Sequence, residues 1–364
     1  MPYGAAGLYA GGTTGLPLFP GDAAAGFRIW YPAEPRSGSS VAPYAAEAQS
    51  ARRRGWLSRG QAMQDAEPAK HADRFPVLLF FPGWGGTSSQ NTVLLQDLAS
   101  HGCIIAASDV WNPAAYPGDT TAAADLATPL SFDSDAATAA AVVAGARNAT
   151  RQAQLAVSLL DRLAALDAAD PVGRFTGRLD LDHVGVLGFS FGGSVAVETA
   201  LRDPRVRAVA NLDGGVFTDA YLQGFRQPYL LLSMPPMTKA DLLSPNPVVR
   251  REAELTLIDE ERLDGFMTRW GGVRAIIQGM AHVNFQDAPL LNDWRQVGGG
   301  IDPARARAVV SDFLLAFFNH HLRGTPSPLP ASLLAAPDVS LQTWQSAPTR
   351  SDAYDALSWP AYAP

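Results

Sequence analysis

The sequence predicts an α/β fold in which a mostly parallel central sheet is flanked by helices. Short apolar runs alternate with longer stretches of helical period, which is typical of parallel strands joined by crossover helices. The run at 76–81 is continuously apolar and stops at Pro82 and Gly83, as expected for a strand covered on both faces. Hydrophobic residues make up 47% of the chain, enough to fill the core of such a fold.

The strands and helices of this sheet can be placed in chain order. Edge strands are expected within residues 1–35, and a helix over 90–100 precedes a strand that begins at Cys103. The alanine-rich stretch 136–166 predicts one long helix or two shorter ones. The final helix should begin after Asp302, which can cap it, and end at Gly324. Further strands are expected at 181–188, 206–212, 229–233 and 273–278.

We expect one domain over residues 1–364, because α/β folds commonly run to about 250 residues or more as one unit. Residues 45–73 are polar and charged without a persistent period, which predicts a surface insertion. Residues 112–136 are loop-like and include aromatic side chains, so we expect them to cover a pocket. The proline-rich tail at 326–364 is expected to wrap the surface.

Charge and cysteine content narrow the function classes. The formal net charge of -7 argues against a nucleic-acid partner, since phosphate binding needs clustered positive charge. Cys103 is the single cysteine, so an intramolecular disulfide and a cysteine metal cluster are both excluded, and we expect it to act as a small buried hydrophobe. Because no clustered metal-ligand spacing is present, the sequence predicts neither a metal nor an organic cofactor.

Two observations bear on location. The N-terminus has no basic segment followed by an apolar run, so we expect a cytoplasmic protein, with a trimmed secreted form as the alternative. No stretch approaches about 18 uninterrupted apolar residues, so no transmembrane segment is expected. The basic run 52–54, followed by Trp56 and Leu57, is consistent with a solvated surface or with a peripheral membrane contact.

The strongest local motif is the run 188–193, Gly-Phe-Ser-Phe-Gly-Gly, which matches the G-x-S-x-G nucleophile elbow. It directly follows an apolar strand and precedes a plausible helix, which is the context that the chemistry requires. A serine hydroxyl is a weak nucleophile, so it must project from a sharp turn toward a base. The motif therefore predicts Ser190 as a nucleophile, and without chemistry it would be a glycine-rich turn.

The base and the acid follow from the chain order Ser, Asp or Glu, then His, of the α/β-hydrolase fold. Three of the six histidines precede Ser190, and His320 and His321 fall at the end of the last helix. This leaves His282, directly after the strand 273–278, as the general base. Asp213 follows the strand 206–212 and is the favoured acid, because the competing position after 229–233 offers no carboxylate before Asp241.

The remaining site residues surround the elbow. A tetrahedral oxyanion needs two pre-aimed donors. The backbone amide of Phe191 can supply one, and the loop 81–86 can supply the other, which we assign to the amide of Trp84. The aromatic side chains of Trp84, Trp111 and Phe191 predict an apolar substrate-binding wall for an acyl group, although aromatic residues are also common in cores.

Taken together, these segments resemble the platelet-activating-factor acetylhydrolase family, including its bacterial relatives. The match is piecewise over residues 76–290: 81–85 resembles that family's oxyanion loop, 188–193 its elbow, and 211–213 and 282–285 its acid and histidine segments. The resemblance implies an α/β-hydrolase fold, Asp213 as the acid, and an acetyl-phospholipid-like substrate. The chain departs from the family at Phe81-Pro82 and at Phe189, which are commonly Ser-His and His there.

The sequence thus predicts a serine-dependent carboxylic ester hydrolase that forms an acyl-enzyme and acts on short-chain or modified acyl esters. Its expected partner is a small-molecule ester or a lipid substrate. A cutinase-like polyesterase is one alternative and would need an open groove. A binding protein that kept the fold and lost the activity is another alternative. Reaction of Ser190 with a fluorophosphonate would separate an active hydrolase from such a binding protein.

Overall fold

The computed structural model describes residues 9–18, 26–34, 40–42, 62–70, 74–108, 111, 113–215, 217–224, 226–291, 298–325 and 331–345. Of the predicted insertion at 45–73, only 62–70 lie within these ranges, and the basic run 52–54 lies outside them. The tail beyond residue 345 is also outside the described residues.

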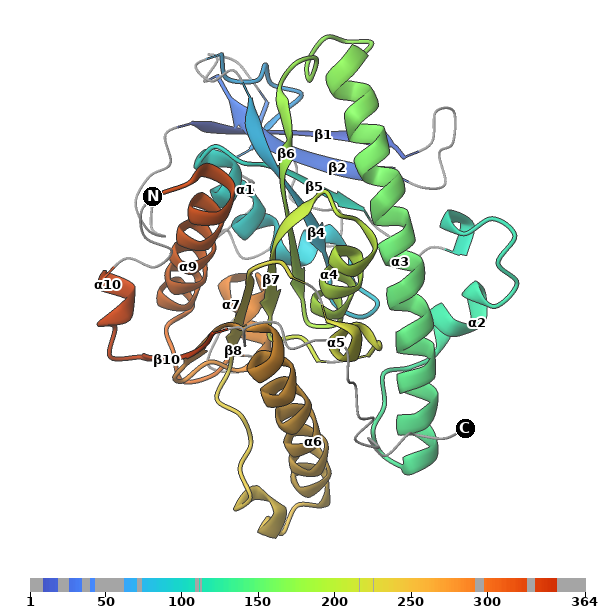
Figure 1. Cartoon of the computed structure of the whole chain (residues 1–364), viewed down its shortest axis with the longest axis vertical. Coiled ribbons are helices and arrows are strands. Elements are labelled where there is room, and N and C mark those ends of the chain that lie inside the picture. Colours follow the sequence, from blue (N-terminus) through green and yellow to red (C-terminus); the bar gives the residue numbers. More distant parts are fainter. Residues whose placement is uncertain are drawn as a thin grey trace.

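The described residues form a ten-stranded sheet with the order β10-β9-β8-β7-β6-β4-β5-β2-β1-β3 (Figure 1). The block from β5 to β9 is parallel, β2 is antiparallel to β5, and β10 is antiparallel to β9. The sheet is therefore mostly parallel, as the sequence predicts. Its strands are β1 (Ala10–Pro17), β2 (Gly26–Ala33), β3 (Met63–Gln64), β4 (Phe75–Phe81), β5 (Ile104–Ser108), β6 (Leu179–Phe189), β7 (Val206–Leu212), β8 (Tyr229–Ser233), β9 (Gly272–Ile277) and β10 (Val339–Trp344).

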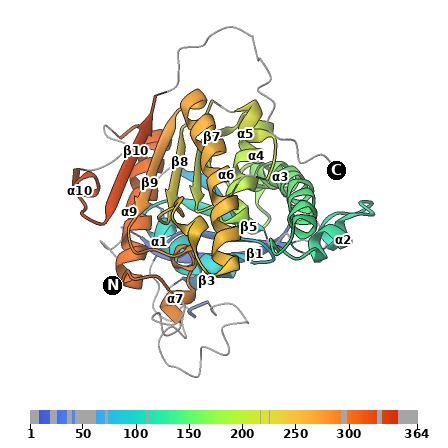
Figure 2. The same ribbon diagram turned by 90° about the horizontal axis from the view of Figure 1, so that it is seen from below.

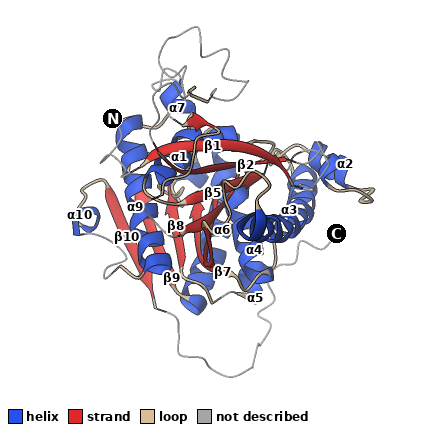
Figure 3. Cartoon of the chain, turned by 90° about the horizontal axis from the view of Figure 1, so that it is seen from above, coloured by secondary structure: helices blue, strands red, loops and turns tan. Residues whose placement is uncertain are grey.

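Helices cover both faces of this sheet. Figures 2 and 3 show β7 to β10 between α9 on one side and α4 and α6 on the other. The α-helices are α1 (Thr92–Ser100), α2 (Ala122–Ala127), α3 (Asp135–Ala169), α4 (Phe191–Arg202), α5 (Ala220–Gln223), α6 (Pro247–Trp270), α7 (Ala288–Leu291), α9 (Pro303–Arg323) and α10 (Ala331–Leu334). Short 3-10 helices are η3 (Ser88–Asn91), η4 (Pro113–Ala115), η5 (Asp241–Leu243) and η6 (His282–Phe285).

Strand β4 shows why the predicted apolar run is a central strand. All seven of its residues are buried. Val77, Leu79 and Phe81 join the core cluster under α3 and α4, whereas Leu78 and Phe80 join the cluster under α1 and α9. Because successive side chains of a strand point to opposite faces, only a continuously apolar run suits a sheet covered on both sides.

Two helices follow their sequence signals closely. The Asp302 side chain accepts hydrogen bonds from the backbone N–H groups of Ala304 and Arg305, and Gly324 ends α9 in the left-handed conformation at φ 68°. The alanine-rich stretch is one helix, α3, which is 35 residues long and is capped by Ser134. The sequence alone is compatible with one long helix or two shorter ones.

The structure adds elements that the sequence analysis did not place. Helix α6 spans Pro247–Trp270, and its first turn is capped by Asn246. The tail expected to wrap the surface instead contributes α10 and β10 in its described part, 331–345. Strand β10 pairs with β9 and so satisfies backbone groups that would otherwise be exposed at the edge of the parallel block. No helix of the described residues is both long and apolar enough to cross a bilayer.

Candidate active site

Ser190 lies at the sharp turn between the end of β6 and the start of α4. Its backbone has φ 55° and ψ -124°, a combination that non-glycine residues rarely adopt. The turn is held by two backbone hydrogen bonds, from the N–H of Ser190 to the carbonyl of Leu212 at 2.8 Å and from the N–H of Gly193 to the carbonyl of Ser190 at 2.9 Å. This geometry is that of a nucleophile elbow, which presents the side chain at the carboxyl edge of the sheet.

The glycines of the elbow are required by close backbone approach. A Cβ atom at Gly188 would collide with the carbonyl oxygen of Gly192, and one at Gly192 would collide with that of Phe81. A Cβ at Gly193 would collide with the side-chain amide of Asn211. The glycines of the motif are therefore needed because β6, α4 and the end of β4 cross so closely that a Cβ atom would not fit. Their freedom to adopt unusual backbone angles is a separate property.

His282 begins the 3-10 helix η6, a few residues after β9. Its Nε2 lies 2.8 Å from Ser190 Oγ, and its side chain is 41% exposed. Asn284 fixes the surrounding loop, because its Oδ1 accepts hydrogen bonds from the backbone N–H groups of Ala281 at 2.7 Å and Gly299 at 3.0 Å. From beneath, the ring of Phe189 packs against the imidazole, with centroids 5.0 Å apart and planes 30° apart. The imidazole is thus held from its own loop and from β6.

Asp213 follows β7 and is the third member of the group. Its Oδ2 lies 2.7 Å from His282 Nδ1, and its Oδ1 accepts a hydrogen bond from the backbone N–H of Met234 at 2.9 Å. The carboxylate is nearly buried, with 8% of its side chain exposed. Below it, the buried amide of Asn211 accepts from the N–H of Gly214 at 2.8 Å and donates to the hydroxyl of Tyr229 at 3.0 Å. Ser190, His282 and Asp213 therefore meet, as the sequence predicts, although they come from three separate strand ends.

The loop that follows β4 borders the nucleophile. A Cβ atom built on Gly83 would lie 3.4 Å from Cβ of Ser190 and 3.1 Å from the ring of Phe189. The next residue, Trp84, carries one of the two amides expected to face an oxyanion. The other belongs to Phe191, the first residue of α4, whose N–H has no acceptor within its own helix. Gly83 thus borders Ser190 and Phe191 directly follows it, and the assignment of the Trp84 and Phe191 amides to an oxyanion hole stays a prediction.

Four aromatic rings gather next to the nucleophile, and we call them the aromatic cluster. Trp84 lies 5.0 Å from Phe191 and 5.2 Å from Trp111 between ring centroids. Phe217 completes the cluster, at 5.5 Å from Phe191 and 6.0 Å from Trp84. Phe191 is buried, whereas the other three rings are partly exposed and can contact a bound molecule.

Phe217 was not predicted from the sequence. It lies after β7 in a loop without regular period, and its N–H donates to Ser194 Oγ at 3.3 Å. The signal for it is on another element: a Cβ atom on Gly145, in the middle of α3, would collide with the Phe217 ring. A glycine inside a long alanine-rich helix indicates a close neighbour, but it does not say which residue that neighbour is.

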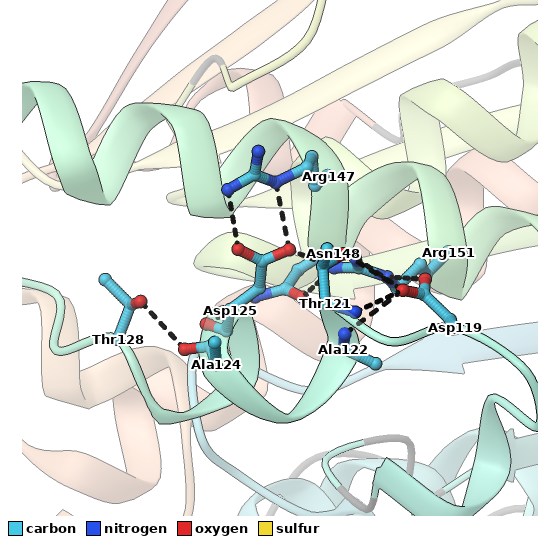
Figure 4. A network of polar contacts seen from close by, with 9 residues as sticks. All are labelled: Asp119, Thr121, Ala122, Ala124, Asp125, Thr128, Arg147, Asn148 and Arg151. Carbon is cyan, nitrogen blue, oxygen red and sulfur yellow. Dashed lines mark hydrogen bonds and ion pairs between the residues drawn. The ribbon is translucent and has the colours of Figure 1, made fainter.

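The segment that follows Trp111 is fastened to α3 by a polar network (Figure 4). Asp125 of α2 forms ion pairs of 2.7 Å with both Arg147 and Arg151 of α3, and Arg151 also binds Asp119. The Arg151 side chain is 8% exposed and that of Asp125 is 5% exposed. Although burial opposes it, hydrogen bonding to the two guanidinium groups lowers the pKa of Asp125. The expected pocket cover at 112–136 thus contains η4 and α2, anchored to α3; its covering role stays a prediction.

Among the described residues, no group of three or more His, Cys, Asp or Glu side chains is arranged to hold a metal ion. Cys103 directly precedes β5 and is buried in the core cluster under α1 and α9, and burial raises the pKa of its thiol.

Comparison with known proteins agrees with the architecture. Residues 76–236 match a family model described as alpha/beta hydrolase fold, and the protein has this fold. A solved structure of a ferulic acid esterase from Streptomyces cinnamoneus is similar: it is 28% identical, with a TM-score of 0.59, over 93% of this chain and 97% of that one. No curated protein matches the sequence.

Proposed function

We propose that the protein is a serine-dependent carboxylic ester hydrolase in which Ser190 is the nucleophile, His282 the general base and Asp213 the orienting acid. The observation that carries the proposal is the continuous relay of contacts, 2.8 Å from hydroxyl to imidazole and 2.7 Å from imidazole to carboxylate. The elbow conformation of Ser190 and the two amides beside it support the same role.

The reaction follows from these positions. With Nδ1–H donating to Asp213, the Nε2 of His282 accepts the hydroxyl proton as Ser190 Oγ attacks the acyl carbon. The amides of Trp84 and Phe191 stabilise the oxyanion that forms. The bond to the alcohol breaks as His282 returns the proton to the leaving oxygen. A water molecule then attacks the acyl-enzyme by the same route and releases the carboxylic acid.

The aromatic cluster supports a flat or otherwise modified acyl group. Trp84 lies on the oxyanion loop and Phe191 directly follows the nucleophile, with Trp111 and Phe217 packed against them, so an acyl chain bound at Ser190 would contact this cluster. The similar solved structure is that of a ferulic acid esterase, which favours an aromatic acyl group among the modified acyl esters. The resemblance to the platelet-activating-factor acetylhydrolase family favours acetyl esters as the second candidate.

The test is hydrolysis by the wild type and by Ser190→Ala. We expect the wild type to hydrolyse p-nitrophenyl acetate, p-nitrophenyl butyrate or methyl ferulate, and Ser190→Ala to lose about 10⁴-fold or more in kcat. Ser158→Ala, a partly exposed serine of α3, is the matched control and should retain full activity. A fluorophosphonate probe should label the wild type and Ser158→Ala but not Ser190→Ala.

The relative rates on these esters and on a polyester film would separate the acyl classes. Faster turnover of methyl ferulate than of the acetate supports the aromatic class, and the reverse supports the acetyl class. A wild-type protein that neither hydrolyses any ester nor reacts with the probe would disprove the proposed function.

A further inference from the structure

The 3-10 helix η3 connects the two loops that complete the site. One is the oxyanion loop, residues 83–86, which follows β4. The other is the histidine loop, residues 279–287, which follows β9. Gln90 of η3 contacts both: its side-chain Oε1 accepts a hydrogen bond from the N–H of Gly83 at 3.1 Å, and its backbone carbonyl accepts one from the N–H of Asp287 at 2.7 Å.

The Gln90 side chain fills the concave side of the oxyanion loop. The loop is closed by a hydrogen bond of 3.0 Å from the N–H of Gly86 to the carbonyl of Gly83. A Cβ atom on Gly86 would collide with the Gln90 amide, so this glycine leaves the space that the amide occupies. One side chain therefore touches the loop at both ends, on either side of the Trp84 amide.

Other residues of the same region fasten the histidine loop without Gln90. Asn91 donates from Nδ2 to the carbonyl of Phe285 at 2.7 Å, and Asp287 accepts at Oδ2 from the N–H of Val93 at 2.9 Å. The Gln90 bond to Asp287 is made by the main chain and survives any substitution of the side chain. Changing this side chain should therefore affect the oxyanion loop and leave the histidine loop in place.

We propose that Gln90 is a positioning residue for the oxyanion hole, which holds the N–H of Gly83 and thereby aims the amide of Trp84 at the developing negative charge. This inference rests on the proposed function. The N–H of Trp84 lies in the peptide that follows Gly83, and φ and ψ of Gly83 set how that peptide is turned relative to the one that Gln90 holds. Without the Gln90 acceptor the first peptide loses its anchor, and glycine has little steric preference to keep these angles fixed. A misaimed donor costs rate in the transition state while ground-state binding is little changed.

The test uses Gln90→Met, which keeps the length of the side chain but offers only a weak sulfur acceptor. Since loss of one oxyanion donor costs about 10²–10³-fold in kcat, we expect its misalignment to cost about 10–100-fold, with KM within about threefold of the wild type. Affinity for a boronic acid transition-state analogue should fall by a similar factor. The rate is taken per active site, from titration with a fluorophosphonate, so that partial unfolding does not count as lost catalysis.

Two further variants separate this role from a structural one. Gln154→Met, at an exposed position of α3, is the matched control and should behave as the wild type. Gln90→Glu keeps an acceptor oxygen and, at about 0.5 M salt to screen the added charge, should retain more kcat than Gln90→Met. The pH profile of kcat/KM should be unchanged in Gln90→Met, which adds no charge, because the histidine loop keeps its contacts.

The outcomes distinguish the two proposals. A wild type that is inert toward esters overturns the proposed function and the inference with it. An active wild type together with a Gln90→Met variant whose kcat per active site is within twofold of it overturns the inference alone. A Gln90→Glu variant that is as impaired as Gln90→Met also overturns the inference. If Gln90→Met does not fold, an inactive Gln90→Glu variant overturns it in the same way.

Discussion

Ser190 and Asp213 both have a positive φ, of 55° and 56°, which L-residues rarely adopt. Such a residue costs on the order of 1–3 kcal/mol and persists only where its surroundings fix it. Here the surroundings are the backbone bond from Ser190 to Leu212 and that from Asp213 to the carbonyl of Leu232, at 2.8 Å each. The strain lies at the two turns that present a hydroxyl and a carboxylate to one imidazole.

The Asp213→Asn variant tests the role of the carboxylate at this scale. In the wild type, Oδ1 accepts from the N–H of Met234, so the asparagine oxygen should take that place and its NH₂ group should face His282. The imidazole would then carry its proton on Nε2 and could not accept one from Ser190. We expect kcat to fall about 10⁴-fold with little change in stability.

The readouts are steady-state hydrolysis and thermal unfolding of the same preparations. Asp241→Asn is a suitable control, since Asp241 is a surface carboxylate that accepts hydrogen bonds from Thr238 and lies outside the relay. An Asp213→Asn variant with near-wild-type kcat would show that His282 is oriented by other groups.

The three side chains of the proposed triad, which the structure brings together, could be selected from the sequence because their proposed chemistry restricts the residue type. Few histidines follow the elbow, and few carboxylates follow a strand end, so elimination leaves His282 and Asp213. Phe217 and Gln90 cannot be found by such elimination, because their proposed roles do not require a chemically reactive side chain. Phenylalanine and glutamine are ordinary core and surface residues, and their roles here depend on contacts with Gly145 and Gly83, which only tertiary structure brings near.

At the scale of elements, two arginines of α3 attach α2 to that helix, and they differ in how deeply they are buried. Both bind Asp125, but Arg151 is nearly buried, whereas the side chain of Arg147 is 53% exposed. We expect Arg151→Met to lower the free energy of unfolding by about 1–3 kcal/mol, because it leaves buried acceptors of Asp125 with fewer partners. Arg147→Met, the matched control on the same carboxylate, should cost about 0–1 kcal/mol.

Urea denaturation of both variants measures this difference. Equal losses for Arg147→Met and Arg151→Met would mean that burial does not decide the strength of these ion pairs. A change in ester hydrolysis by Arg151→Met without loss of stability would in turn connect the segment after Trp111 with the active site.

Helix α6 and strand β10 could not be predicted from the sequence, and the physical reason is similar for both. Helix α6 has few buried residues, Ala253, Leu263, Phe266 and Met267, and is rich in charged residues, so no apolar run marks it in the sequence. Strand β10 alternates between partly exposed and exposed residues and is stabilised by pairing with β9, a contact that its own sequence does not encode. By contrast, the fully buried β4 and the capped α9 carry their signals locally.

At the scale of the whole molecule, the sheet separates two cores, one beneath α3 and α4 and the other beneath α1 and α9. The proposed active site lies where β6, β7 and β9 end, so each of its three polar side chains directly follows a strand of the parallel block or lies a few residues beyond it. This arrangement explains why an exposed imidazole can be held at hydrogen-bond distance from both of its partners.

We expect the C-terminal part of α9 to make the stability of this molecule depend on pH. His321 packs edge-on against Phe317, with ring centroids 4.6 Å apart, and beside His320. Burial, with a smaller contribution from the nearby charge of His320, lowers the pKa of His321 from 6.5 to about 4. In the unfolded chain this imidazole takes up its proton near pH 6.5, whereas in the folded chain it stays neutral until about pH 4.

Acidification from pH 6.5 to 4 should therefore destabilise the protein, since the unfolded state binds up to about one proton more than the folded state in this window. The contribution of His321 is constant above pH 6.5 and again below pH 4. The variant His321→Gln removes the titrating group, so it should lose less stability than the wild type between pH 7 and pH 4.5. Urea denaturation of both proteins at the two pH values measures the effect, with the difference at pH 7 as the baseline for the substitution itself. Equal losses on acidification would show that His321 is protonated in the folded protein as readily as in the unfolded chain.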